Sequence, residues 1–164
     1  MANYLEQLVS EWYEFRGYFV RKNILVGKRR AGGHESELDV VAFHPGESKL
    51  VHIEPSMDAN SWPLREKRYR KKFRAGKKYI PGLFAGMEIP EDITQIALFG
   101  YMGNNPRRSL AGGTVVTLRE FLREICDNIG SHSTAKNIIP ETYTILRTIM
   151  FMVEHRRDIF RDSG

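Results

Sequence analysis

Residues 37–56 read ELDVVAFHPGESKLVHIEPS, two short apolar segments joined by a turn signal. Each segment is typical of a strand, and His44-Pro45-Gly46-Glu47 between them is typical of a hairpin turn. Each predicted strand carries one acid among its apolar residues, Asp39 in the first and Glu54 in the second. The stretch therefore predicts an antiparallel hairpin with an acid on each arm.

The turn sets which residues face each other across this hairpin. Either a two-residue loop at 45–46 or a four-residue loop at 44–47 pairs Asp39 opposite His52, which makes Glu54 a diagonal neighbour on the same face. Such neighbours lie about 7–8 Å apart, so two carboxylates can converge on one hard cation that takes oxygen ligands at about 2.0–2.1 Å. The pattern also fits two solvated acids on a polar face, and His52 fits a hydrogen-bonded histidine better than a ligand.

The spacing of these acids resembles a known family. Asp39, fourteen intervening residues and then Glu54-Pro55-Ser56 are similar to the motif of the PD-(D/E)xK nuclease superfamily, which has the restriction-endonuclease-like fold. Glu6 stands eleven residues before Gly17-Tyr18, as in members where a glutamate-bearing helix precedes a Gly-aromatic pair at the first strand. The resemblance covers residues 3–101 and implies an α/β αβββαβ core, a mixed central sheet flanked by helices.

The resemblance also implies a metal-dependent active site. Asp39 and Glu54 would hold Mg²⁺ or Mn²⁺, assisted by the Pro55 carbonyl. Glu6 would hold a second ion, directly or through water. These ligands follow from the family motif.

The chain departs from the family motif at two positions. Leu38 stands where the family has proline, and Ser56 stands where the family has the lysine that positions or activates water and stabilises charge at the phosphate. The Ser56 hydroxyl could orient a group but carries no charge. Some members supply the lysine from the next helix, and the spacing does not choose among the three candidates there, which are Lys67, Lys71 and Lys72.

Positive charge is concentrated in one segment, residues 65–78, REKRYRKKFRAGKK. It carries a net charge of +8, which leaves −3 for the rest of the chain. Asn60 or Ser61 is placed to cap a helix here and Gly76 to end it. A helix this basic favours a phosphate-rich partner, because neutralising phosphates releases counterions. We expect DNA contacts from this helix and from the basic loop before the hairpin, at Lys28, Arg29, Arg30, Arg65, Arg68, Lys71, Lys72, Arg74, Lys77 and Lys78.

The length and composition fit one domain. With 164 residues, 41% of them hydrophobic, the chain can bury one sizeable core. An apolar stripe from Ile145 to Val153 suits either core packing or a homodimer face. The predicted elements are helices at 4–16, 62–76, 117–128 and 140–160 and strands at 18–26, 37–43, 49–56, 93–101 and 114–118, with residues 102–164 added to the nuclease-like core.

Several classes of protein and site do not fit the composition. One cysteine, Cys126, cannot form an internal disulfide, and five scattered histidines give no cluster at zinc spacing. The N-terminal segment MANYLEQLVSEW is acidic and amphipathic, unlike a signal peptide. No apolar run approaches the roughly 20 residues that span a bilayer. We therefore expect a cytoplasmic protein without a membrane partner.

Together these patterns predict a divalent-metal-dependent endonuclease, a phosphodiesterase that hydrolyses DNA, with duplex as the expected substrate. One alternative is a nucleic-acid-binding module on the same fold, whose cleavage activity was lost with the lysine. The other is an interaction subunit that dimerises through the 140–160 helix and whose basic surface binds an acidic protein.

Overall fold

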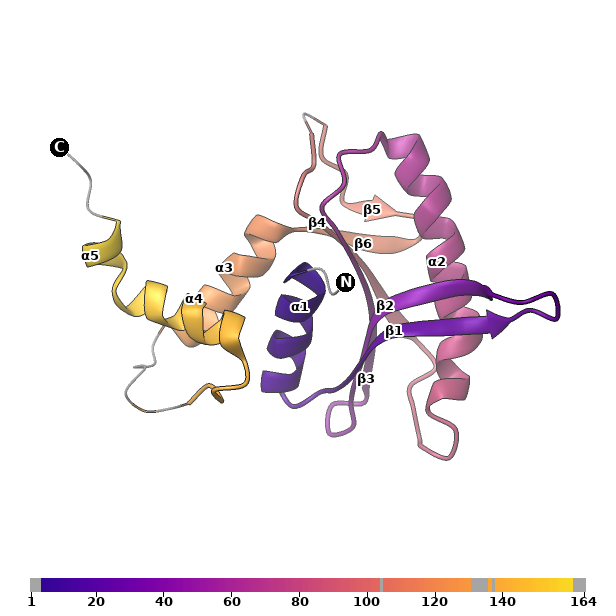
Figure 1. Ribbon diagram of the computed structural model, residues 1–164, viewed down its shortest axis with the longest axis horizontal. Coiled ribbons are helices and arrows are strands. Elements are labelled where there is room, and N and C mark those ends of the chain that lie inside the picture. The colour runs from indigo at the N-terminus through magenta and orange to yellow at the C-terminus, as the bar shows by residue number, and fades with distance from the viewer. Residues whose placement is uncertain (1–3, 104, 131–135, 137, 161–164) are drawn as a thin grey trace. The chain divides into compact units, whose positions relative to one another are not determined.

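A computed structural model of the chain describes residues 4–103, 105–130, 136 and 138–160. Its contacts group the chain into two compact units, residues 1–118 and 119–164. The first unit is a mixed six-stranded sheet with a helix on each face (Figure 1). The predicted α/β class, a mixed sheet flanked by helices, is confirmed.

The first unit follows the predicted order of helix, three strands, helix and strand, and then adds two short strands. The strand order in the sheet is β1-β2-β3-β4-β6-β5, with the first three strands antiparallel and β3, β4 and β6 parallel. The elements are α1 (Tyr4–Phe15), β1 (Phe19–Lys28), β2 (His34–His44), β3 (Lys49–Ser56), α2 (Trp62–Leu83), β4 (Ile93–Phe99), β5 (Ser109–Leu110) and β6 (Gly113–Thr117).

The helix α2 joins β3 to β4, because two parallel strands need a long crossover connection. It contacts all strands from β1 to β5, whereas α1 contacts β1, β2 and β3 from the opposite face (Figure 1). Apolar side chains hold α2 on the sheet: Tyr69 and Phe73 pack with Phe99, and Ile80 packs with Phe43. The face of the sheet that carries this core also carries the candidate site.

The basic helix is longer than predicted. We expected Gly76 to end it, but α2 continues to Leu83. Gly76 is buried in its middle, where a Cβ atom would overlap the His52 ring of β3. The glycine therefore permits the close approach of α2 to β3 and does not act as a cap.

The predicted hairpin forms, but its register differs from the prediction by two residues. His44 pairs with Lys49, so the loop comprises residues 45–48. Ser48 closes this loop in the left-handed region with a φ of 48°, a conformation uncommon for residues other than glycine, asparagine and aspartate. His52 consequently pairs with Val41 and not with Asp39.

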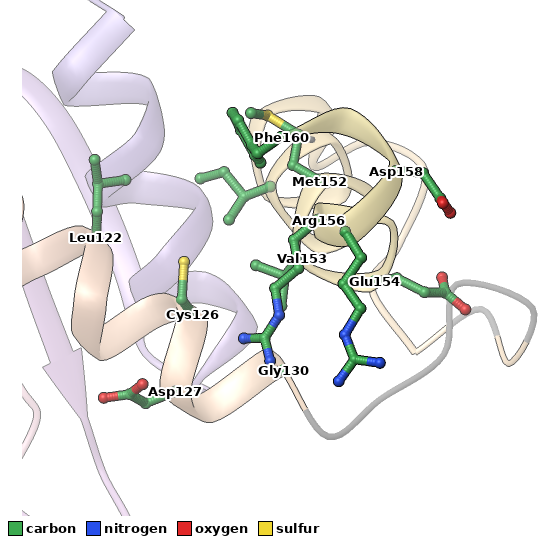
Figure 2. A pocket seen from close by; sticks show the side chains of 12 residues that line it. Leu122, Cys126, Asp127, Gly130, Met152, Val153, Glu154, Arg156, Asp158 and Phe160 are labelled. Atoms are coloured by element: carbon green, nitrogen blue, oxygen red, sulfur yellow. The ribbon is translucent and has the colours of Figure 1, made fainter. Parts of the chain in front are cut away.

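The second unit contains the helices α3 (Leu118–Ile129), except for its first residue, α4 (Thr144–Glu154) and α5 (Arg156–Ile159). The single last helix predicted at 140–160 is in fact divided at His155. Of its apolar stripe, Leu146 and Met150 are buried. Within this unit, Leu122 and Cys126 of α3 line a cavity with Met152, Val153 and Phe160 (Figure 2). No described helix is long and apolar enough to cross a membrane.

Candidate functional site

Asp39 and Glu54 lie where two strands of the sheet part. The pairing between β2 and β3 ends at Val40 and Ile53, one residue before the two acids. Beyond this point β2 continues beside β1, and β3 continues beside β4. The acids therefore occupy the fork between diverging strands, directly opposite each other in register, and we call this position the fork site.

The pairing between β1 and β2 is interrupted at the same place. Asn23 and Asp39 are opposite in register but unpaired. Asn23 has a φ of 53°, a left-handed conformation that asparagine adopts more readily than most residues. The backbone N–H of Asp39 donates to Glu54 Oε1 at 3.2 Å. The two acids are therefore linked through the main chain of Asp39 as well as through their side chains.

Lys72 of α2 completes the fork site. Its ammonium donates to Asp39 Oδ1 at 2.6 Å and also to Glu54 Oε2. Burial lowers the pKa of Lys72, but the two carboxylates raise it more, and the net pKa is raised. Of the three lysines that could replace the family lysine, the structure brings this one to the acids.

Glu54 is the most enclosed member of the fork site, with its side chain only 1% exposed. His52 Nε2 lies 2.7 Å from Glu54 Oε1, and the Tyr69 hydroxyl donates to the Glu54 carbonyl at 3.0 Å. Burial lowers the pKa of His52 to about 4, so its ring is neutral near pH 7. Because Lys72 donates to Oε2, both carboxylate oxygens of Glu54 have partners within the protein.

Asp39 differs from Glu54 in being at the edge of the site, with its side chain 17% exposed. Burial and the neighbouring Glu54 carboxylate raise the pKa of Asp39 to about 7, although Lys72 acts to lower it. Two carboxylates share one ammonium here, so one negative charge is left over when both are ionised. A further cation at this site would relieve their repulsion.

Ser56 is not part of this group. Its hydroxyl donates to Asp58 Oδ2, and its oxygen accepts the backbone N–H of Asp58 at 3.2 Å. Asp58 in turn binds Arg65 Nε at 3.1 Å and Arg68 Nη2 at 2.8 Å. The serine that was predicted to stand at the motif's lysine position is therefore tied to the loop that follows β3.

Two of the residues predicted to bind DNA, Arg65 and Lys72, have largely covered side chains that are paired within the protein. Arg65 is buried, donates to the Asp58 and Tyr101 carbonyls at 2.6 and 2.8 Å, and stacks 4.2 Å from the Phe99 ring. This arrangement leaves its guanidinium unavailable to a phosphate. Lys72 likewise faces the acids of the fork site.

The other predicted cations lie on the surface. Lys67, Lys71 and Arg74 line a groove of about 600 Å³ along α2, which Glu35 of β2 also borders. These three side chains form no ion pair with any residue that the structure describes. Arg68 is half-exposed beside Asp58. The remaining exposed cations of the prediction are Lys28, Arg29, Arg30, Lys77 and Lys78, the last of which pairs with Glu35 at 3.1 Å.

Glu6 and the Pro55 carbonyl remain predicted ligands. Glu6 lies in the first turn of α1, where the Tyr4 hydroxyl is 3.6 Å from Met57 Sδ, just after β3. Pro55 follows Glu54 in β3 and is in register with Leu98 of β4. The helix α1 packs on the face of the sheet opposite to α2 and Lys72, so the role of Glu6 stays a prediction.

The donors of the fork site suit a particular kind of metal ion. No group of three or more His, Cys, Asp or Glu side chains that could hold a metal occurs among the described residues. Two carboxylates fit Mg²⁺, which keeps several waters and binds through one or two carboxylates plus substrate phosphates. Lys72 contacts the same oxygens, so an ion and the ammonium would compete for them.

Sequence reasoning placed His52 beside the two acids as a hydrogen-bonded histidine, and the structure gives it Glu54 as its partner. It missed Gln95, the buried partner of His52. Gln95 is a polar residue within the apolar strand β4, but only the parallel pairing of β3 with β4 brings it beside His52.

No protein-family model matches the chain, and a search of curated proteins found no match either.

Proposed function

We propose that the chain is a Mg²⁺-dependent DNA phosphodiesterase with a restriction-endonuclease-like core. The observation that carries the proposal is the contact of Lys72 with both Asp39 and Glu54. A lysine from the helix can supply the positive charge that is absent from β3, where Ser56 stands. The order of helix, three strands, helix and strand agrees with the core that the motif implies.

In this proposal the residues of the fork site have distinct roles. Asp39 and Glu54 would hold Mg²⁺ with the Pro55 carbonyl, and Glu6 would hold a second ion. Bound there, the metal would polarise the scissile phosphate and lower the pKa of a water. Lys72, 21% exposed, would stabilise the negative charge that develops as the phosphate is attacked.

The basic groove along α2 supports DNA as the substrate. Lys67, Lys71 and Arg74 line it without ion-pair partners among the described residues, and phosphate oxygens are the natural acceptors for such a row of cations. Contacts to phosphates position nucleic acid without specifying its sequence. We therefore propose sequence-independent, salt-sensitive binding at this surface.

A second candidate is a binding module without cleavage activity. It is favoured by the fact that Lys72 already neutralises part of the charge of the two acids, which is also what a purely structural ion cluster would do. The module would bind DNA through the same groove and would not depend on divalent metal.

Cleavage assays on supercoiled plasmid and on labelled linear and branched DNA separate the two candidates. The nuclease predicts products that require Mg²⁺ or Mn²⁺ and that disappear in both Asp39→Ala and Glu54→Ala. The binding module predicts retention of DNA by all three proteins and no product from any of them.

A further inference from the structure

A chain of buried polar groups connects the helix α2 to Glu54. Gln95 Nε2 donates to the Phe73 carbonyl at 2.8 Å and lies 3.2 Å from His52 Nδ1. His52 Nε2 then lies 2.7 Å from Glu54 Oε1. His52 is fully buried, and Gln95 is 5% exposed, so water does not substitute for these partners.

The chain of contacts fixes the tautomer of His52. The Phe73 carbonyl can only accept, so the amide atom of Gln95 beside it is the nitrogen, which can only donate. The second N–H of this amide therefore points to Nδ1 of His52, which must accept. The ring proton is then on Nε2, and His52 donates to Glu54 Oε1.

This arrangement separates the two oxygens of Glu54. Oε1 receives the His52 N–H and the Asp39 backbone N–H. Oε2 faces Lys72 and the partly exposed Asp39 side chain. The carboxylate is thus held in one orientation, with one oxygen bonded inside the protein and the other directed to the fork site.

We propose that His52, with its tautomer set by Gln95, is a positioning residue that orients Glu54 for divalent metal. The inference rests on the proposed function, because it assigns His52 a role behind a metal ligand. Groups that orient metal ligands in this way commonly contribute about 10–100-fold to metal affinity.

Three variants of β3 separate positioning from packing. His52→Phe keeps a flat ring beside Phe73 but removes the donor, whereas the side-chain amide of His52→Gln can still donate to Glu54. Ile53→Val is the matched control, since Ile53 is equally buried but lies next to His52 on the other face of the strand. The experiment measures Mn²⁺ affinity by calorimetry, together with kcat and KM for plasmid cleavage.

We expect His52→Phe to bind Mn²⁺ about 10–100-fold more weakly and to lose kcat with little change in KM. We expect His52→Gln to recover most of the loss and Ile53→Val to match wild type. Should His52→Phe not fold, Gln95→Met supplies the same test, because it removes the group that sets the tautomer and is expected to weaken Mn²⁺ binding.

Two results would overturn the inference, and they are distinguishable. If wild type binds Mn²⁺ and cleaves DNA while His52→Phe or Gln95→Met binds Mn²⁺ equally well, the positioning role is wrong and the proposed function stands. If wild type neither binds Mn²⁺ nor cleaves, the proposed function fails and the inference fails with it.

Discussion

We predict that the free energy of unfolding of Asp39→Asn, relative to that of wild type, is higher at pH 8 than at pH 5. Asp39 is enclosed beside the Glu54 carboxylate, and these two effects raise its pKa from 3.8 to about 7. Asparagine has nearly the same shape, but it does not ionise. The substitution therefore removes the cost of placing a second negative charge in the fork site.

The sign and size of the effect follow from the two pKa values. Between about pH 4 and pH 7, Asp39 keeps its proton in the folded protein but has released it in the unfolded chain. Asp39 therefore contributes most to stability at low pH, and this contribution is lost as the pH rises through 7. Between pH 5 and pH 8 the loss amounts to about 3 kcal/mol, which the Asp39→Asn variant should not show.

Urea unfolding at pH 5, 6.5 and 8 measures this difference, and the fluorescence of the fully buried Trp12 reports the transition. His52 titrates in both proteins, so its contribution largely cancels. The quantity of interest is the change with pH in the variant's free energy of unfolding relative to wild type. The absolute offset also contains the lost ion pair with Lys72.

Asp58→Asn is the control, because partial burial raises the pKa of Asp58 but hydrogen bonds from Ser56, Asn60 and Arg65 outweigh it and keep the pKa below its ordinary value. Its difference from wild type should be constant between pH 5 and pH 8. A difference for Asp39→Asn that is equally constant, or that falls with pH, would refute the account of the fork site.

Further predictions concern the helix α2. Gly76→Ala should lower the free energy of unfolding by about 1–3 kcal/mol, because its methyl group would overlap His52. Gly82→Ala has open space around it and should raise the free energy of unfolding by up to about 1 kcal/mol. Urea unfolding of both variants measures these changes. Arg74→Met should lower the slope of log affinity for DNA against log salt by about 1 without changing stability. Arg65→Met should instead cost about 3 kcal/mol of stability, because it leaves Asp58 without its buried partner, and should leave the salt slope unchanged; salt titrations and thermal melts separate these outcomes.

The order of elements and the two acids of the hairpin could be predicted from the sequence. The register could not, because the loop is closed by Ser48 in a left-handed conformation that its residue type does not suggest. The shift by two residues moved Asp39 from opposite His52 to opposite Glu54. The error changed the distance between the two acids but not the face of the sheet on which they lie, since residues two apart in a strand share a face.

The helical pattern of α2 distinguishes Lys72 from the other two candidate lysines. Lys72 directly precedes Phe73 and follows Tyr69 by three positions, so it borders the apolar face of α2, whereas Lys67 and Lys71 point toward the groove. Arg65 precedes Tyr69 by four positions, so the same pattern places it on the apolar face of α2. Its acceptors could not be predicted, because Asp58 lies in a loop and the Tyr101 carbonyl is 36 residues away.

The central claim is that Lys72 acts with the two acids in metal-dependent cleavage of DNA. The most direct test compares wild type with Lys72→Met and with Lys71→Met, which removes the adjacent charge from the groove and leaves the fork site intact. In a plasmid-nicking assay with Mg²⁺, the account predicts nicking by wild type and by Lys71→Met, and a loss of about 100-fold or more in Lys72→Met. Wild type that never nicks, or Lys72→Met that nicks as fast as wild type, would contradict it.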